Sequence, residues 1–572
     1  MMDQLQTATV FWVVFMLSCG MIFNQNAVTA HKVRHYDFKI EYANVSRICH
    51  SKALVSVNGE FPGPTVYAEE GDRVIVKVTN HVQANVTIHW HGIRQLLTGW
   101  SDGPAYITQC PIQTGQSFTY DFRVVSHRGT LFWHAHISWL RATLYGAIII
   151  HPRRGLPLPF PKPDGEFPVL LGEWWNGDVE QIEMDALRTG GIPIISNAFT
   201  INGQPGPFYN CSTADVYKLK FKAGKTYILR MVNAALNQDL FFGIANHSLT
   251  IVEVDGEYTK PLTVPTLVLS PGQTADVLVT ATQDHGRYFM AAKPYVSAPV
   301  PFVPIPTTAI IEYETSTEAE LSQPPVFPAL PANNDTVYGE NFFQSIRSLN
   351  SKQYPVHVPQ TIDRDLLFTV SFNLKACPPG QLCSGPGNVT KFASSMNNIS
   401  FIFPSISILQ AYFFNINGVF SRDFPDMPPH PFNYTGPMIN PQPEVGTKVN
   451  VIPFGSNVQL VLQDTSILNL DSHPIHLHGY SFFVVGQGVG NFNPSTDPAN
   501  FNLIDPPFRN TVAFPRAGWV AIRWTADNPG VWFMHCHLET HTSWGMEMAF
   551  LVTNGKGKKQ TLPHPPKDLP KC

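Results

Sequence analysis

The sequence predicts an all-β protein built from three consecutive β-sandwich domains, and two observations lead to this fold class. Charged residues make up only 14% of the 572 residues, while 50 prolines and 40 glycines punctuate short apolar runs. That mixture is typical of a turn-rich β protein with a large buried core. The second observation is an internal repeat, in which two strand signatures recur three times in the same order.

The first signature is a glycine followed by alternating apolar residues and a closing Asn or Asp. It reads GDRVIVKVTN from Gly71, GKTYILRMVN from Gly224 and GSNVQLVLQD from Gly455. Alternation of this kind predicts a β-strand with one buried face. Each copy is therefore expected to be the same strand of a repeated sandwich.

The second signature ends in His-x-His in the first and third copies, but in Ala-Ala-Lys in the middle copy. It reads GTLFWHAH from Gly129, GRYFMAAK from Gly286 and GVWFMHCH from Gly530. The middle domain is therefore expected to serve as a spacer or wall. Because proline-rich stretches separate the copies, we expect domains at residues 31–155, 165–320 and 360–572.

Residues 1–30 are predicted to be a secretory signal peptide. Residues 8–23 form an apolar run, and AVTA ending at Ala30 offers small residues for cleavage. Residues 1–7 contain no Lys or Arg, so an uncleaved membrane anchor is the alternative. No later segment is long and apolar enough to span a bilayer, and we expect a secreted protein with no membrane partner after cleavage.

Eight N-x-S/T sequons agree with secretion and predict surface N-glycans. They lie at Asn44, Asn85, Asn210, Asn246, Asn334, Asn388, Asn398 and Asn433. The formal net charge is −4, and no basic stripe occurs. Nucleic acid is therefore excluded as a partner.

The cysteine count is odd once the signal peptide is removed, because Cys19 is one of eight cysteines. Six can pair, and spacing alone permits any connectivity among Cys49, Cys110, Cys211, Cys377, Cys383 and Cys572. The seventh, Cys536, is flanked by histidines, so a metal site would explain the unpaired thiol.

Ten of the 21 histidines lie in four short motifs. The motifs are HWHG at His89 and His91, HAH at His134 and His136, HPIHLHG at His473, His476 and His478, and HCHLETH at His535, His537 and His541. On a strand, residues i and i+2 face the same side, so each His-x-His projects two imidazoles together. One such pair is compatible with core histidines bonded to backbone. Four pairs, two from each of two matching domains, predict metal ions.

The ligand types indicate copper. Two His, one Cys and an axial Met describe a blue-copper electron-transfer centre, and Cys536, His541, Met546 and His473 supply such a set. Mixed Cys/His zinc sites usually draw on several cysteines. Strand alternation sends the Cys536 sulfur away from its two histidine neighbours. A copper on Cys536 would then be connected, through only a few covalent bonds, to metals held by His535 and His537. Electrons could enter singly at the first site and collect at the second for the reduction of dioxygen.

The four motifs, in this order and spacing, resemble those of a plant laccase of the multicopper oxidase family. The resemblance covers essentially the whole mature chain, on the lines HWHGIRQLLTGWSDGPAYITQCPI, GTLFWHAHISWLRATLYGAIIIHP, HPIHLHGYSFFVVG and GVWFMHCHLETHTSWGMEMAFLV. It implies three cupredoxin-like Greek-key domains holding four copper ions. It also implies a monomer secreted to the extracellular space, in the apoplast or cell wall.

The resemblance further implies particular ligands and disulfides. The type 1 copper would be bound by His473, Cys536 and His541, the type 2 copper by His89 and His476, and the type 3 pair by His91, His134, His136, His478, His535 and His537. The implied disulfides are Cys49–Cys211, Cys110–Cys572 and Cys377–Cys383.

Three further side chains have implied roles near the metals. Asp102 and Glu539 match positions that help deliver protons to reduced dioxygen. The alternatives are a turn residue for Asp102 and an exposed loop charge for Glu539. Met546 departs from the leucine common in plant laccases, and a thioether there should lower the copper potential. The alternative for Met546 is packing without coordination.

We therefore expect an oxidase that takes single electrons from phenols, monolignols or flavonoids and reduces O2 to two waters. Met546 favours electron-rich catechols and hydroquinones. Such an enzyme would act in lignin or phenolic polymerisation or degradation. Ascorbate or metal-ion oxidation is the alternative within the class. A copper-free cell-wall protein of the same fold is the second alternative, although such a protein would be expected to lack several ligands that are present here.

Overall fold

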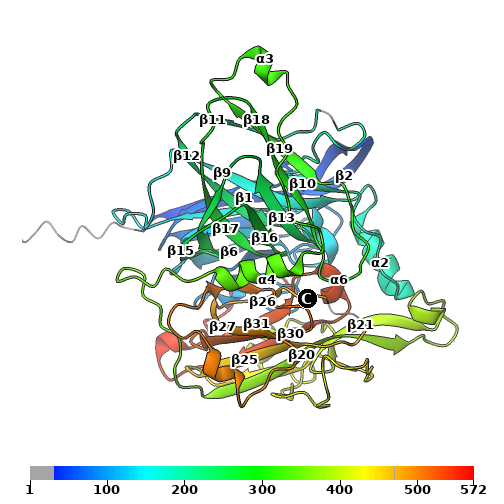
Figure 1. Ribbon diagram of the computed structural model, residues 1–572. Helices are drawn as coiled ribbons and strands as arrows, with labels where there is room; N and C mark the ends of the chain where they lie inside the picture. Colours follow the sequence, from blue (N-terminus) through cyan, green and yellow to red (C-terminus); the bar gives the residue numbers. More distant parts are fainter. Residues whose placement is uncertain (1–30, 213, 469–470) are drawn as a thin grey trace, which may run out of the picture.

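The computed structural model describes residues 31–212, 214–468 and 471–572, and these residues form three β-sandwiches (Figure 1). The expected signal peptide lies outside the described residues. The first sandwich packs the sheet β2 (His50–Val57), β1 (Val33–Arg47), β4 (Arg73–Asn80), β6 (Ser117–Arg123) on the sheet β3 (Val66–Glu69), β8 (Tyr145–His151), β7 (Gly129–Ala135), β5 (Ile88–His91).

The second sandwich has a six-stranded and a five-stranded sheet. The six-stranded sheet runs β10 (Ala198–Ile201), β9 (Gly165–Trp174), β12 (Thr226–Asn233), β17 (Thr274–Thr280), β14 (Leu249–Val254), β15 (Glu257–Val264). The five-stranded sheet runs β11 (Lys218–Phe221), β19 (Thr307–Tyr313), β18 (Arg287–Tyr295), β13 (Asp239–Ile244), β16 (Thr266–Leu269).

The third sandwich has an eight-stranded and a five-stranded sheet. The larger runs β23 (Glu444–Gly446), β22 (Ile399–Phe401), β21 (Thr390–Met396), β20 (Arg364–Ala376), β25 (Asn457–Asp464), β30 (Gly518–Thr525), β27 (Phe482–Val489), β28 (Phe508–Arg509). The smaller runs β24 (Val449–Ile452), β32 (Glu547–Val552), β31 (Gly530–Cys536), β26 (Ile475–Leu477), β29 (Thr511–Val512).

The repeat predicted from the sequence is confirmed by the strand pairing. The first signature forms β4, β12 and β25, each lying between one parallel and one antiparallel neighbour. The second signature forms β7, β18 and β31, each lying between two antiparallel neighbours. The same strand thus carries histidines in the first and third sandwiches and Ala-Ala-Lys in the middle one.

Helices are few among the described residues. Helix α2 (Val179–Thr189) begins at Asp178, whose side chain accepts from the Glu180 amide, and ends at Gly190 in the left-handed region. It packs against the 3-10 turn η2 (Ser138–Ala142) and α6 (Glu539–Ser543). The remaining helices are α3 (Glu318–Leu321), α4 (Thr336–Ser345) and α5 (Ile408–Phe414), with 3-10 turns η1 (Gly99–Ser101), η3 (Pro386–Asn388), η4 (Asp497–Asn500) and η5 (Lys558–Gln560).

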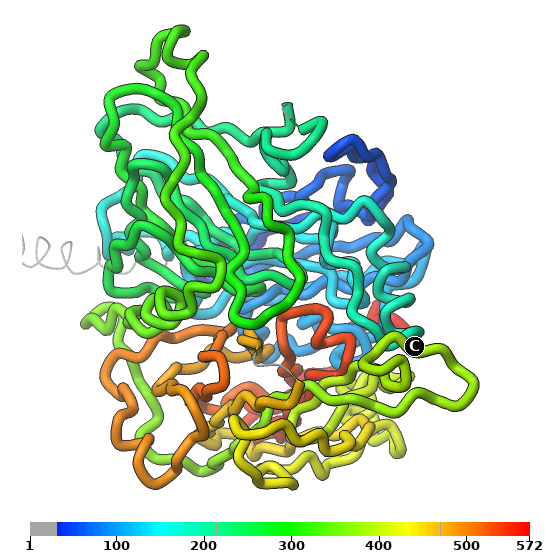
Figure 2. Tube along the Cα trace, turned by 45° about the vertical axis from the view of Figure 1, so that its right-hand side comes forward, coloured from blue at the N-terminus to red at the C-terminus, as the bar shows by residue number. Residues whose placement is uncertain are grey.

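Each sandwich has its own apolar core, and smaller apolar clusters join the sandwiches. Phe132 and Tyr145 of the first pack with Leu170 and Val232 of the second. Trp100 of the first packs in a cluster with Phe533 of the third. The chain of the third sandwich, yellow to red in Figure 2, lies below the other two. The three sandwiches therefore meet around one interior region.

The three implied disulfides are confirmed: Cys49–Cys211, Cys110–Cys572 and Cys377–Cys383. The first joins the first two sandwiches, and the second fixes the C-terminal residue to the first sandwich. Within the described residues, Cys536 is the only free cysteine, and it is buried. None of the helices in that part of the chain has the length and apolar character needed to cross a membrane.

Candidate metal centre

The histidine pairs occupy matching strands of the first and third sandwiches. On β5 and β7, His89 lies opposite His134. On β26 and β31, His476 lies opposite His535. Because residues two apart on a strand share a face, each hairpin-like pair of strands presents several imidazoles to the space between the two domains. The eight histidines of the four His-x-His pairs are all at least partly buried: His89, His91, His134, His136, His476, His478, His535 and His537.

Six of the eight histidines form two groups of three. Ligand atoms lie within 4.8 Å of one another in the group His136, His478 and His535, and likewise in the group His91, His134 and His537. The Nε2 atom of His535 lies 3.3 Å from that of His136 and 3.2 Å from that of His478. His89 and His476, which remain, lie together in a further group with His91. Each group draws on both domains, so the centre exists only when they are docked.

The ring nitrogens show that the residues fit a metal cluster. The Nδ1 atoms of His89, His134 and His476 lie 2.7, 2.7 and 2.8 Å from backbone carbonyl oxygens. A carbonyl only accepts, so Nδ1 carries the proton and leaves Nε2 with a lone pair. Each of these Nε2 atoms is buried without a hydrogen-bond partner. An oriented, unpartnered imidazole nitrogen is what a metal ion requires.

His91 has the opposite orientation. Its Nε2 atom lies 3.0 Å from the hydroxyl of Thr511, and its buried Nδ1 atom has no partner. The Thr511 hydroxyl donates to Oδ1 of Asn510, so it accepts from Nε2 of His91 and leaves the free lone pair on Nδ1. Thr511 lies 420 residues further along the chain, so only the docked third sandwich determines this orientation.

Burial also keeps the imidazoles of His91, His478 and His535 neutral. It lowers the pKa of His535 to about 3, and it lowers the pKa of His91 and His478 well below the usual value, with neighbouring histidines as the second cause. A neutral imidazole is the form that ligates a metal. Protonation therefore does not compete with metal binding near neutral pH.

The carboxylate of Asp102 lies inside this cluster. Its Oδ2 atom is 2.9 Å from Nδ1 of His478, and its Oδ1 atom is 3.5 Å from Nδ1 of His89. The side chain is fully buried, and burial raises its pKa against the opposing influence of His89. Asp102 can therefore hold a proton within hydrogen-bond distance of His478, a histidine of the cluster.

Cys536, His473 and His541 form a separate group of ligands. The Cys536 sulfur lies 3.4 Å from Nδ1 of His541 and 3.8 Å from Nδ1 of His473, and all three residues are buried. Burial raises the pKa of the thiol well above its usual value. A thiolate in this place therefore requires a cation beside it, which a bound metal would supply.

Met546 lies in the same apolar core as Cys536 and is completely buried. The Cys536 amide donates to the Met546 carbonyl at 3.1 Å, and the Met546 amide donates to the His541 carbonyl at 3.1 Å. The backbone thus places Met546 next to the group, although these contacts involve its main chain.

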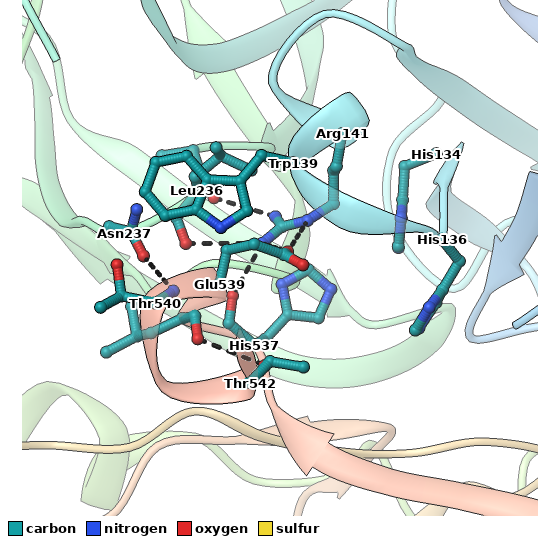
Figure 3. A network of polar contacts seen from close by, with 12 residues as sticks. His134, His136, Trp139, Arg141, Leu236, Asn237, His537, Glu539, Thr540 and Thr542 are labelled. Carbon is teal, nitrogen blue, oxygen red and sulfur yellow. Dashed lines mark hydrogen bonds and ion pairs between the residues drawn. The ribbon is translucent and has the colours of Figure 1, made fainter. Parts of the chain in front are cut away.

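Glu539 lies outside the groups of metal-ligating side chains found among the described residues. Its carboxylate accepts from Nε and Nη2 of Arg141, at 2.9 and 2.7 Å (Figure 3). It is therefore neither a free surface charge nor a direct neighbour of a cluster nitrogen. Arg141 was not singled out in the sequence. Its only signal there was its place five residues after His136.

An apolar cavity of about 340 Å³ adjoins His541. Its walls include the aromatic side chains of Trp139, Trp175, Phe199, Phe302, Phe372, Phe392 and Trp544. Two carboxylates, Glu173 and Asp471, also line it, and burial raises the pKa of both. The cavity thus offers an aromatic molecule a site beside His541, a member of the ligand group that contains Cys536.

Fold and site together define a protein with one group of a cysteine and two histidines beside a cluster of eight imidazoles, and these are donor types that copper proteins use. Models described as multicopper oxidase match residues 39–155, 165–316 and 416–556. The chain is 54% identical to Laccase-4 of Oryza sativa subsp. japonica, covering 94% of this chain and 95% of that protein. It is 52% identical to Laccase-4 of Arabidopsis thaliana, covering 98% and 99%.

Among solved structures, the laccase from Botrytis aclada matches with a TM-score of 0.75 and 26% identity, covering 94% of this chain and 89% of that one. The chain therefore belongs to the multicopper oxidase family and, within it, to the plant laccases. Copper is its cofactor, and the donor set of imidazoles with one thiol fits that metal.

Proposed function

We propose that this protein is a laccase that oxidises phenols in the cavity beside His541 and reduces dioxygen at the histidine cluster. The observation that carries this proposal is the placement of Cys536 between His535 and His537. Its sulfur belongs to one ligand group, while its two neighbours belong to the two histidine triads. Bound copper ions would supply the electron transfer, taking single electrons from the phenol and delivering four to dioxygen.

The geometry supports the assignment of each ligand. We assign His473, Cys536 and His541 to the type 1 copper, with Met546 as the axial ligand. The two triads correspond to the type 3 pair, and His89 with His476 corresponds to the type 2 copper. The ligand atoms within each triad are close enough for one shared ion. In the triad of His91, His134 and His537, each ring also has a buried nitrogen without a competing partner.

The cavity supports a phenolic substrate. Its aromatic walls would stack on a planar ring, and His541 forms part of the wall. A phenol seated there would contact His541, which belongs to the ligand group of Cys536. Glu173 and Asp471 would accept hydrogen bonds from, or take protons from, phenolic hydroxyls. The alternatives of ascorbate or metal-ion oxidation offer no similar use for so apolar a cavity.

Asp102 supports proton delivery to the cluster. Reduction of dioxygen to water consumes protons, and a buried carboxyl group with a raised pKa is able to hold one. A proton held by Asp102 would lie beside His478, whose Nδ1 atom is 2.9 Å from Oδ2 of Asp102. We keep Glu539 as a second candidate, but its pairing with Arg141 means that it would have to leave that ion pair to act as an acid.

We also propose that the protein is secreted, glycosylated and monomeric. Seven of the eight sequon asparagines are exposed, whereas Asn398 is half-buried. Asn398 also donates from Nδ2 to the Gln442 carbonyl at 3.0 Å. That amide nitrogen is the atom a glycan would occupy, so glycosylation is expected at the other seven positions.

An absorption spectrum of the copper-loaded protein, followed by turnover with a catechol and with ascorbate, tests this function. An intense blue band with a near-ultraviolet shoulder, together with oxygen uptake on catechol, is the expected result. Ascorbate preferred by far would overturn the phenol assignment. A colourless protein that takes up no copper would overturn the oxidase function itself.

A further inference from the structure

Arg141 is a buried arginine whose guanidinium touches all three sandwiches. Only 2% of the residue is exposed. It belongs to η2 of the first sandwich and donates to the carbonyls of Ala235 at 3.0 Å and Leu236 at 3.4 Å in the second. In the third, it donates to the carboxylate of Glu539 and, from Nη2, to the carbonyl of His537 at 2.9 Å (Figure 3).

His537 is distinctive among the cluster histidines because its ring makes no hydrogen bond. Both Nδ1 and Nε2 of His537 are buried without a partner. By contrast, Nδ1 of His535 lies 2.8 Å from the Cys536 carbonyl. The other two members of the His537 triad, His91 and His134, also each have one nitrogen bonded. No second contact therefore fixes the His537 imidazole through its own ring, although one is usual for metal-bound histidines.

The main chain of His537 is held instead. Its amide donates to the Pro474 carbonyl at 2.6 Å, and its carbonyl accepts from Arg141. Gly272 of the second sandwich supports the ring itself: a Cβ atom added there would lie 2.9 Å from the imidazole. The position of this imidazole thus depends on a carbonyl contact on one side and on a glycine turn on the other.

The loop that carries Ala235 and Leu236 is tied to the same segment. The Glu539 amide donates to the Leu236 carbonyl at 3.0 Å, and the Thr540 amide donates to Oδ1 of Asn237 at 2.9 Å. Arg141 completes this set by bonding both sides of the junction. Its planar fork is suited to several fixed acceptors at once, which a lysine ammonium cannot match.

We propose that Arg141 is a positioning residue for His537: it fixes the carbonyl of the residue that directly follows Cys536, and through it the imidazole of one triad. This inference rests on the proposed assignment of His537 to the type 3 copper pair. Removing the guanidinium leaves the His537 carbonyl and the Glu539 carboxylate without their shared donor in a buried place. The His537 segment would then relax, while Cys536, whose ligand group Arg141 does not touch, would keep its geometry.

The variant Arg141→Lys tests the proposal because it keeps the charge and removes the fork. We expect the blue band of the type 1 copper to persist while the near-ultraviolet shoulder of the type 3 pair is weakened or lost. The copper affinity of the cluster, measured by dialysis against a chelator, should fall by about 10–100-fold, the range for loss of a contact that orients a metal ligand. Copper per chain and the ratio of the two absorption features are the readouts.

Arg230→Lys is the matched control. Arg230 is buried and paired with Asp276 and Glu166 inside the second sandwich. Its loss should reduce thermal stability but leave the absorption ratio and copper count unchanged. If both variants lose copper equally, or if Arg141→Lys loses the blue band and the shoulder together, Arg141 is merely structural and the proposal is wrong.

Gly272→Ala provides a second route should Arg141→Lys fail to fold. Gly272 has φ of +89°, and the added Cβ would press on the His537 ring. The expected result is again a selective loss of the near-ultraviolet shoulder, and retention of the full shoulder would refute the dependence of His537 on these contacts. Failure of the proposed function is distinct, because the unsubstituted protein would then show neither feature.

Discussion

Replacing Asp102 with Asn separates its role as a proton donor from its role as a packed side chain. The carboxyl group is fully buried, contacts His478 at 2.9 Å and lies 3.5 Å from His89. Asparagine keeps the shape and one acceptor oxygen. It removes the acidic proton, so the substitution isolates the chemistry from the packing.

The two roles differ in expected magnitude. Exchanging one charge-assisted hydrogen bond for a neutral one costs about 1 kcal/mol of stability, and the relief of charge burial offsets part of this. Loss of a general acid costs about 10²–10⁴-fold in rate, which corresponds to roughly 3–5 kcal/mol of barrier. Asp102→Asn should therefore slow the reaction with dioxygen far more than it destabilises the fold.

The assay is a two-step one. The copper-loaded protein is reduced by a catechol without oxygen and then mixed with dioxygen, while the blue band reports each step. Reduction should proceed at the normal rate because it occurs at the cavity beside His541, whereas return of the blue band should be slow. Asp276→Asn, a buried carboxylate paired with Arg230, is the control.

The pH dependence supplies a further check. Because burial raises the pKa of Asp102, the reoxidation rate of the natural protein should fall as pH rises through that pKa. The variant should show no such fall. A reoxidation rate within about twofold of the natural one, far short of what loss of a general acid causes, would show that protons reach the cluster by another group.

Three further predictions follow from the structure. Met546→Leu should raise the type 1 potential, because a thioether stabilises the oxidised ion, as a redox titration of the blue band would show; an unchanged potential means no coordination. Burial raises the pKa of Glu183 to about 7 and of Asp239 and Glu257 to about 8. The folded state thus binds these protons more tightly than the unfolded state does. The stability that these groups contribute is therefore complete below about pH 4 to 4.5, and Tm should fall as the pH rises towards 8. Glu183→Gln should flatten that fall. Asn398 should carry no glycan in peptide mass spectra, and an occupied site would contradict its bonded amide.

The sequence was sufficient to predict the repeated architecture and the chemical nature of the site. A period of two along a strand determines that His89 and His91 share a face, and the repeat places the same strand in the first and third sandwiches. The odd cysteine count pointed to Cys536. These features are local or repeated, so they are visible without knowing how the domains dock.

The features that the sequence did not reveal depend on docking. The orientation of His91 is determined by Thr511, and the carbonyl that orients His476 belongs to Asn510. Arg141 contacts residues almost 400 positions away. No periodicity relates such positions, because the contacts arise when separately folded sandwiches come together. The walls of the cavity beside His541 likewise come from loops and strands of all three sandwiches.

The middle sandwich shows why a domain without metal ligands still matters to the site. Among the described residues, none of its side chains belongs to a metal-ligating group. Nevertheless, its Gln273 side chain donates to the Thr511 carbonyl at 3.2 Å, and its Asp255 binds Arg509 of the third sandwich. The Gln273 contact supports Thr511, whose hydroxyl contacts His91 and His476. Gly272 and the carbonyls that accept from Arg141 support His537 in the same way. Because each triad joins the first and third sandwiches, a small shift between those two would separate its nitrogens. The middle sandwich, bonded to both, opposes that shift, which makes it a structural support for the cluster and not merely a spacer.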